Sequence, residues 1–150
     1  MSPRYPQLLA DIATALGTIN PARLITRTWL DFGYRPAADL ARGVWVVRPA
    51  DIGPYDYETS DNQTATDSLR ATQVSPLQVT ILGQLQLAQG ATGEDVDAAE
   101  FGLIHELEQL ADAAMEIPGL EGLRLQRVQM SQQIECPYAW VMSTWTISPS

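Results

Sequence analysis

Apolar residues recur at three- and four-residue spacings in two stretches of the chain, and this is the period of an amphipathic helix. The first stretch, residues 5–16, predicts a short helix that ends before a glycine. The second and longer stretch follows Thr92, whose spacing to Asp95 is that of a capping box, and its helix is expected to end at a Pro-Gly pair. Most of its acidic side chains, Glu106 among them, are predicted to lie away from the apolar stripe.

Other stretches alternate apolar and polar residues, or are rich in β-branched and aromatic residues, as strands are. They are residues 23–30, 44–47, 77–87, 123–130 and 138–147. The clearest alternation lies in 77–87, which predicts an antiparallel strand with one face on the core and a bulge or bend at Gly83. Residues 31–43 contain two glycines and a proline, so a loop or a wide hairpin connection is expected between the first two strands.

The order of these elements predicts the fold class. A helix, two strands, a long loop, a strand, a helix and two strands fit an α+β layer structure. We expect a mainly antiparallel β-sheet of about five strands with two amphipathic helices packed on it. The length of 150 residues is that of one domain, so residues 1–150 are expected to fold as a single unit.

The segment 50–73 interrupts this order, because it has no sustained apolar period and is rich in acidic and small polar residues. A connection of this length is unusual inside a compact domain and is typical of a functional loop or of disorder. We expect this extended loop to be mobile in the free protein and to become ordered against a neighbouring subunit or partner. Such a polar segment buries too little apolar surface to fix itself.

Charge is distributed unevenly along the chain, whose formal net charge is -9 with no lysine. Residues 1–50 hold six arginines and three acids, residues 51–121 hold fourteen acids and one arginine, and residues 122–150 hold two arginines and one acid. A fold that separates these segments presents one positive and one negative surface, through which like subunits attract head to tail. The alternative is that the acids merely solvate one helix and one loop. The overall acidity argues against a general binder of nucleic acid or of anionic membranes.

Candidate catalytic groups are few. The chain has one histidine, His105, and one cysteine, Cys136, and no Gly-rich phosphate motif or metal-ligand spacing accompanies them. We therefore expect no enzymatic activity, no metal and no cofactor, with a spatial Cys-His pair left open as a minor alternative. The lone thiol excludes an intrachain disulfide and fits a reducing compartment, and no signal peptide or membrane span is predicted. These features favour a cytoplasmic protein.

Aromatic residues and arginines are the candidates for protein contacts. Large aromatic side chains on strands are more often core residues than interface anchors, which applies to Trp29, Trp45, Trp140 and Trp145. The two tyrosines of the 50–73 segment are better placed for a partner, because loops commonly carry contacts. Arg124 and Arg127 are interpreted either as residues of inter-subunit ion pairs or as plain exposed strand residues. The candidate subunit and partner contacts are Tyr55, Asp56, Tyr57, Glu58, Asp61, Arg70, Arg124 and Arg127.

Five stretches, in this order, carry a family resemblance. They are TRTWL, GVWVVRP, LQVTILGQLQL, the helical FGLIHELEQLADA and the terminal YAWVMSTWTI. Together with the N-terminal amphipathic helix, and over roughly residues 5–147, the chain resembles the tail terminator proteins of long-tailed bacteriophages. It is also similar to the Mu-type phage tail-gene family of this size.

The resemblance implies a homo-oligomeric ring on the head-proximal end of the tail tube, and a hexamer is the usual form of this ring in that family. Such a ring ends polymerisation of the phage tail tube protein and joins the tail to the head-tail connector protein. It belongs to the tail or neck of the virion and is assembled in the host bacterial cytoplasm. DNA is expected to pass through the ring without specific binding, because an acidic lumen repels the duplex. No membrane contact and no cofactor are implied.

Three other classes of protein remain open. Another neck or head-completion connector is distinguished from a tail terminator by its place in the assembled particle. A small soluble ligand-binding or enzymatic domain predicts a pocket around His105 or Cys136. An acidic DNA mimic predicts acids on one face at phosphate-like spacing.

Overall fold

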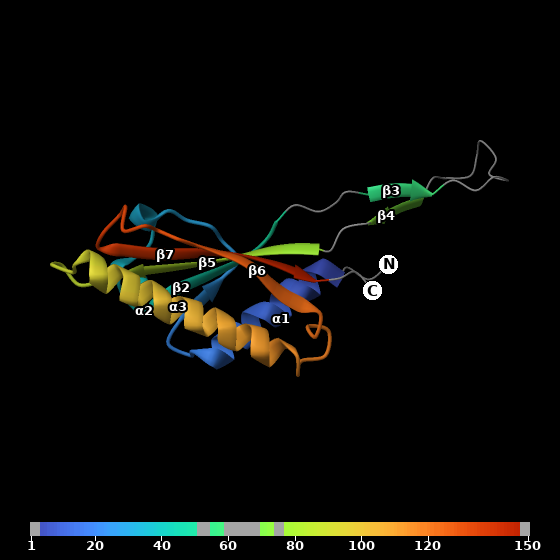
Figure 1. Cartoon of the computed structure of the whole chain (residues 1–150), viewed down its shortest axis with the longest axis horizontal. Helices are drawn as coiled ribbons and strands as arrows, with labels where there is room; N and C mark the ends of the chain where they lie inside the picture. Colours follow the sequence, from blue (N-terminus) through green and yellow to red (C-terminus); the bar gives the residue numbers. More distant parts are fainter. Residues whose placement is uncertain (1–3, 51–54, 59–69, 74–76, 148–150) are drawn as a thin grey trace.

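The computed structural model describes residues 4–50, 55–58, 70–73 and 77–147 (Figure 1). Its helices are α1 (Arg4–Ile19), the short α2 (Ala37–Arg42) and α3 (Gly93–Ala114), with a 3-10 turn, η1 (Phe32–Tyr34), before α2. Its strands are β1 (Leu24–Thr26), β2 (Val44–Pro49), β3 (Tyr55–Glu58), β4 (Arg70–Gln73), β5 (Leu77–Gln86), β6 (Leu123–Met130) and β7 (Tyr138–Ile147). The fold is α+β, as the order of elements predicts.

Five of these strands form one sheet in the order β1-β2-β5-β7-β6. All neighbours are antiparallel except β1 and β2, which confirms the predicted five-stranded, mainly antiparallel sheet with helices packed on it. The parallel pairing of β1 and β2 shows that the hairpin or plain loop predicted for 31–43 is wrong. Parallel neighbours need a crossover connection, and η1 and α2 carry the chain across.

β1 is shorter than the strand predicted over 23–30, because the chain leaves the sheet after Thr26. The backbone amide of Thr28 donates to Thr26 Oγ1 at 3.1 Å, a local bond that competes with strand pairing. Trp29 consequently lies in an irregular segment and not on a strand, contrary to the prediction. This segment passes over the face of the sheet that α1 and α3 leave uncovered, where Phe32 packs against strand residues.

α1 and α3 cover the other face of the sheet and form the main core with it. α3 begins where the sequence predicts: the Thr92 hydroxyl accepts from the Asp95 amide at 3.2 Å, and the Asp95 carboxylate accepts from the Thr92 amide at 2.8 Å. Leucines of both helices lie in the same cluster as Trp45 and Trp145, which are fully buried. These two tryptophans confirm the prediction that strand aromatics form the core.

Gly83 lies within β5 without a bulge, contrary to the prediction. It pairs regularly with Trp45 on one side and Val141 on the other, and a Cβ built on it would lie 2.7 Å from the Trp45 ring. The glycine therefore leaves room for the indole of the neighbouring strand. The register shift of the sheet lies in β6 instead, between Leu125 and Arg127.

Part of the segment predicted as a loop over 50–73 is paired. β3 and β4 form an antiparallel two-stranded ladder, separate from the main sheet, that lies beyond its end in Figure 1. This ladder is not predicted from the sequence, because the polar content of the segment outweighs the short Tyr-Asp-Tyr-Glu alternation. Residues 59–69 lie outside the described residues, so mobility and partner-induced order of this loop stay a prediction.

Candidate interaction surface

The two faces of the sheet differ in how they are covered. Strand side chains alternate between faces, so β2, β5 and β7 each present one set to α1 and α3 and the other set to the opposite side. On that opposite side Leu40 of the crossover is buried together with Val44, Val46 and Leu82, and Phe32 packs against them, whereas Met142 of β7 stays 36% exposed. We call this side the open face. β5 is therefore buried on both sides near its middle, and not on one face alone as predicted.

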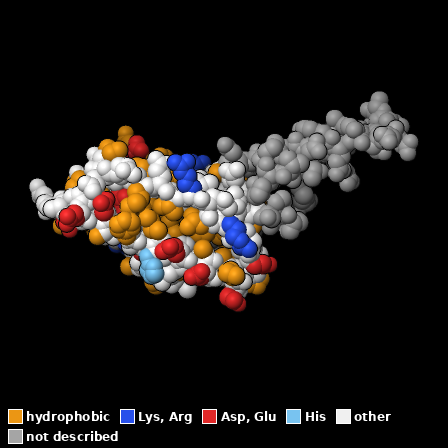
Figure 2. Space-filling model, in the orientation of Figure 1, with side chains coloured by type: hydrophobic (Ala, Val, Ile, Leu, Met, Phe, Trp, Pro, Cys, Tyr) orange, Lys and Arg blue, Asp and Glu red, His pale blue; other side chains and the backbone are white. Residues whose placement is uncertain are grey.

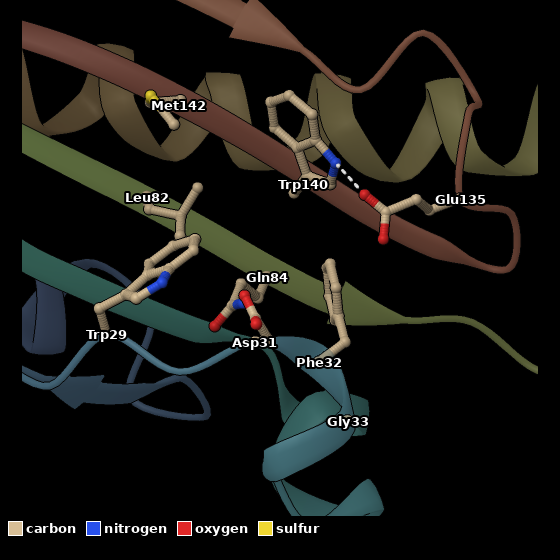
Figure 3. Close-up of a pocket in the computed structure, with 9 residues that line it drawn as sticks. All are labelled: Trp29, Asp31, Phe32, Gly33, Leu82, Gln84, Glu135, Trp140 and Met142. Atoms are coloured by element: carbon tan, nitrogen blue, oxygen red, sulfur yellow. Dashed lines mark hydrogen bonds between the residues drawn. The ribbon is translucent and has the colours of Figure 1, made fainter.

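A hollow of about 330 Å³ lies on the open face under the irregular segment that follows β1 (Figure 3). Aromatic rings of Trp29, Phe32 and Trp140 form its walls, and side chains of β5 and β7 form its floor. Asp31 and Glu135 lie at its rim, and the Trp140 indole donates to Glu135 at 3.3 Å. The full lining is Trp29, Asp31, Phe32, Gly33, Leu82, Gln84, Glu135, Trp140 and Met142.

A second hollow of about 320 Å³ continues from the first along the strands. The two share Trp29, Leu82 and Met142, and the second extends over β2 to Arg48. Together they form one groove, named here the open groove, which is aromatic at one end and reaches an arginine at the other. The groove contains exposed apolar surface, since Trp29 is 45% and Met142 36% exposed.

A buried amide holds the wall of the open groove in place. Arg35 Nε donates to Gln84 Oε1 at 2.6 Å, and Gln84 Nε2 donates to the carbonyl of Leu30 at 2.9 Å. A further guanidinium nitrogen of Arg35 donates to the carbonyl of Thr28 at 2.8 Å. Burial lowers the pKa of Arg35 while the nearby charge of Asp39 raises it, with a net lowering. These bonds tie the segment that carries Trp29 to the polar face of β5.

Arg124 and Arg127 both lie on the open face, because β6 pairs them with Thr146 and Thr144 of β7. Through Thr144 and then β5, the pairing reaches Arg48 on β2, so Arg127 and Arg48 flank one row across the sheet. Three strand spacings separate them, or about 14 Å. Among the described residues, neither these two arginines nor Arg124 has a carboxylate within 4.0 Å. Arg124 donates instead to two nearby backbone carbonyls, at 2.9 and 3.0 Å.

The outer side of α3 has the opposite charge. It presents Glu94, Glu108 and Asp112 to solvent, followed by Glu116 just past the helix end. Two large apolar side chains lie on the same helix side, Phe101 at 60% and Met115 at 63% exposed. Figure 2 shows acidic side chains and the single histidine along α3, with hydrophobic side chains beside them. The fold thus separates an acidic helix face from three arginines on the open face.

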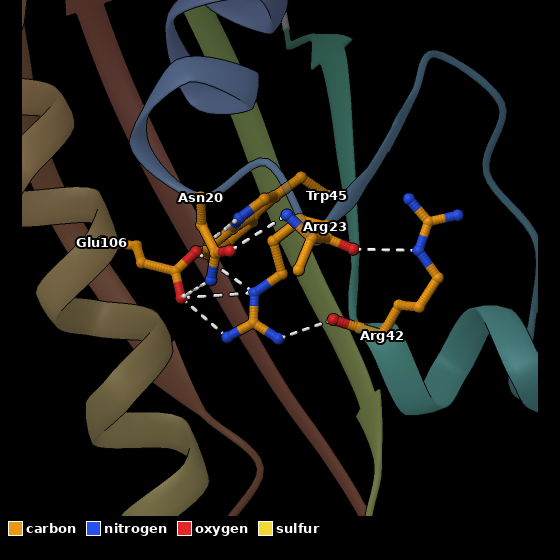
Figure 4. Close-up of polar contacts among 6 residues, drawn as sticks. Asn20, Arg23, Arg42, Trp45 and Glu106 are labelled. Atoms are coloured by element: carbon orange, nitrogen blue, oxygen red, sulfur yellow. Dashed lines mark hydrogen bonds and ion pairs between the residues drawn. The ribbon is translucent and has the colours of Figure 1, made fainter.

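Glu106 is buried on α3, as Glu100 is, and is not turned away from the apolar side as predicted (Figure 4). Arg23 Nη2 lies 2.6 Å from Glu106 Oε2, and Trp45 and Asn20 each donate to the carboxylate at 3.2 Å. Burial raises the pKa of Glu106, but the hydrogen bond and charge of Arg23, together with Trp45 and Asn20, outweigh it and lower the pKa. The cluster joins α3 to α1 and β2 and is structural.

Five of the remaining predicted contact residues lie on the strands of the β3–β4 ladder. By backbone register Glu58 faces Arg70, Tyr57 faces Ala71, Asp56 faces Thr72 and Tyr55 faces Gln73. Their side chains, and the whole of Asp61, lie outside the described residues. The structure therefore places Arg124 and Arg127 on one surface and leaves the role of the loop residues as a prediction.

The two candidate catalytic residues, His105 and Cys136, lie in different parts of the structure. His105 is exposed on α3, with its Nδ1 3.9 Å from Glu108, and borders a shallow hollow. Cys136 is exposed before β7 and donates to the carbonyl of Ala91 at 3.3 Å. Within the described ranges no three His, Cys, Asp or Glu side chains gather as metal ligands, and no helix is long and apolar enough to cross a lipid bilayer.

Comparison with known proteins adds no relative: no protein-family model matches the chain, and no curated protein does.

The open groove was not predicted from the sequence. The sequence predicts Trp29 and Trp140 as core residues, whereas Trp29 is exposed and Trp140 is half-buried in the groove wall. A signal was present in Gly33 and Pro36, which follow Trp29 closely and indicate the end of a strand. The hydrogen bond between Arg35 and Gln84, by contrast, joins residues 49 positions apart, so no local sequence pattern indicates it.

Proposed function

We propose that the protein is a structural subunit of a bacteriophage tail. It forms a ring on the head-proximal end of the tail tube, ends polymerisation of the tube and joins the tail to the head connector. The observation that carries the proposal is the separation of charge between an acidic helix face and an arginine-bearing, partly apolar open face. The sequence resemblance to tail terminator proteins supplies the particular assembly.

A ring made of one kind of subunit needs two different, complementary surfaces on every copy. Only such a head-to-tail contact lets each subunit bind one neighbour on each side. The acidic face of α3 and the open face are candidates for these surfaces, because they lie on opposite layers of the fold. The net charge of -9 suits a channel that DNA crosses without being held.

The same two surfaces would also suit another connector protein of the neck. That alternative differs from a tail terminator only in where the protein lies in the assembled particle. A small-ligand protein is the second candidate, and the open groove is what favours it. Its hollow of about 330 Å³ lies at the lower end of the range of ligand pockets. On that hypothesis the ligand occupies the aromatic end of the groove and not the surroundings of His105 or Cys136, which border no comparable aromatic hollow in the described residues.

The test is assembly of the purified protein with and without tail tubes. Native mass spectrometry is expected to show a closed oligomer, and electron microscopy is expected to show it at one end of each tube. Cys136→Ala, at an exposed thiol that lines neither hollow of the open groove, serves as the control and is expected to assemble normally. A protein that stays monomeric, leaves tube ends bare and is absent from virions would refute the proposal.

A further inference from the structure

We propose that the outer side of α3 from one copy docks along the open groove of the next copy. The acids of α3 contact Arg48 and Arg127, and Phe101 enters the aromatic end of the groove. The inference deepens the proposed function and rests on it for the claim that the contacts close into a ring. The occupant of the groove is therefore a second copy of this chain.

Charge complementarity is the first argument for this occupant. Arg48, Arg124 and Arg127 lie on the open face with no carboxylate within 4.0 Å among the described residues. The exposed side of α3 carries Glu108 and Asp112, and its only basic group is the weakly basic His105. Opposite surface charges steer association and set the register of a contact. An acidic helix is thus the kind of partner that this face recognises.

Dimensions are the second argument. An α-helix with its side chains is about 10–12 Å wide. Arg48 and Arg127 are separated by three strand spacings, or about 14 Å, with the small Thr80 and Thr144 between them. A helix that runs along β5 and β7 fits between the two arginines.

Spacing along the helix is the third argument. Phe101, His105, Glu108 and Asp112 follow one another at four, three and four residues and share one helix face. From Phe101 to Asp112 the helix rises about 16 Å. From the row of Trp140 to the row of Arg127, four residues along β7, the strand rises about 13 Å. Phe101 therefore reaches the aromatic end of the groove when Asp112 is beside Arg127.

Apolar surface completes the match. Phe101 is 60% exposed on α3, and the groove exposes the rings of Trp29 and the side chain of Met142. Aromatic pairs and Met-aromatic contacts stabilise an interface beyond the burial of area alone. Since α3 and the open face lie on opposite layers, each copy contributes one surface to each of two contacts. Such heterologous contacts form rings when the rotation closes.

The experiment is a charge swap between the two surfaces. Arg127→Glu and Asp112→Arg are purified separately, checked for native folding by circular dichroism, and studied by sedimentation velocity alone and as an equimolar mixture. Each variant alone is expected to associate roughly tenfold more weakly than the wild type, because like charges meet at the contact. The mixture is expected to recover association to within about threefold of wild type, since opposite charges meet at every contact when the two variants alternate.

The controls carry the same charge changes elsewhere. Arg42→Glu on α2 and Asp11→Arg on α1 are expected to associate as the wild type does. If one reversal fails to fold, Arg48→Glu with Glu108→Arg replaces the pair. A mixture that stays as weak as its components, or reversals without effect on an associating protein, would overturn the inference and leave the proposed function standing. A wild type that stays monomeric overturns the inference, and it overturns the proposed function too if tube ends stay bare.

Discussion

Glu106 and Gly83 are two residues whose roles depend on the same side chain, Trp45. The indole donates to the Glu106 carboxylate through its nitrogen, and its six-membered ring occupies the space that Gly83 leaves free. Trp45 is fully buried between them. The centre of the fold is therefore fixed by one aromatic ring with a polar contact on one side and a close backbone approach on the other.

Glu106→Gln is expected to lower the free energy of unfolding by about 2 kcal/mol at neutral pH, because it leaves the Arg23 charge without its partner. The pKa of Glu106 is lowered by folding, so its contribution is fully present above the unfolded pKa, near 4.3, and is lost as the pH falls through the folded value. The difference between variant and wild type should accordingly shrink below about pH 4. Urea titrations across this range measure it. Glu108→Gln, at an exposed carboxylate, is the control, and a difference independent of pH would contradict the assignment.

Gly83→Ala is expected to destabilise the protein by about 1–3 kcal/mol, since the new methyl group would lie 2.7 Å from the Trp45 ring. Gly102→Ala is the matched control, because nothing beyond its chain neighbours and the backbone of its own helix lies within 4 Å of the added Cβ. In the middle of α3 that substitution should stabilise by about 0.5–1 kcal/mol. Thermal unfolding of both variants gives the comparison, and equal effects would show that Gly83 is not packed against the ring.

The elements with strong periods were predictable from the sequence, and those that depend on distant partners were not. α1, α3 and the strands β5, β6 and β7 lie where the spacing of apolar residues places them, because each buries a regular face against one core. β1 is shorter than predicted, since the chain turns away from the sheet after Thr26. It also pairs with β2 in the parallel direction, which the sequence does not predict. The position of the irregular segment after β1 is set by Arg35 and Gln84, which meet across 49 residues. Among the predicted contact residues, Arg124 and Arg127 are the two whose side chains the structure describes, and both lie on the open face. The sequence pattern alone does not tell on which face of the sheet they lie.

Arg35→Ala is expected to loosen this segment, because it removes the bonds to Gln84 and to the carbonyl of Thr28. Hydrogen exchange of residues 28–35 should become faster, while exchange in α3 stays unchanged. Arg27→Ala, at a neighbouring exposed arginine, is the control and should leave exchange as in the wild type. Unchanged exchange in Arg35→Ala would mean that packing of Trp29 and Phe32 alone holds the groove wall.

At the scale of the whole molecule, the two charged surfaces give the assembly a characteristic dependence on salt. Exposed ion pairs are screened beyond a Debye length of about 10 Å at 0.1 M ionic strength, so association through them weakens as salt is added. Burial of apolar surface is not screened in this way. The proposed contact contains both kinds of interaction. Arg48 lies at one end of the groove, with Arg127 in the same row across the sheet, and the rings of Phe32 and Trp140 lie at the other end.

Two substitutions should therefore separate the contributions. Arg127→Gln is expected to weaken association and to flatten its dependence on salt, because it removes a charge from the contact. Phe101→Ala is expected to weaken association by a similar amount while the dependence on salt stays as steep as in the wild type, because it removes apolar surface and no charge. Sedimentation velocity at about 0.05 and about 0.5 M salt measures both slopes. If Phe101→Ala flattened the slope as well, or Arg127→Gln left it unchanged, α3 and the open groove would not be the two sides of the contact.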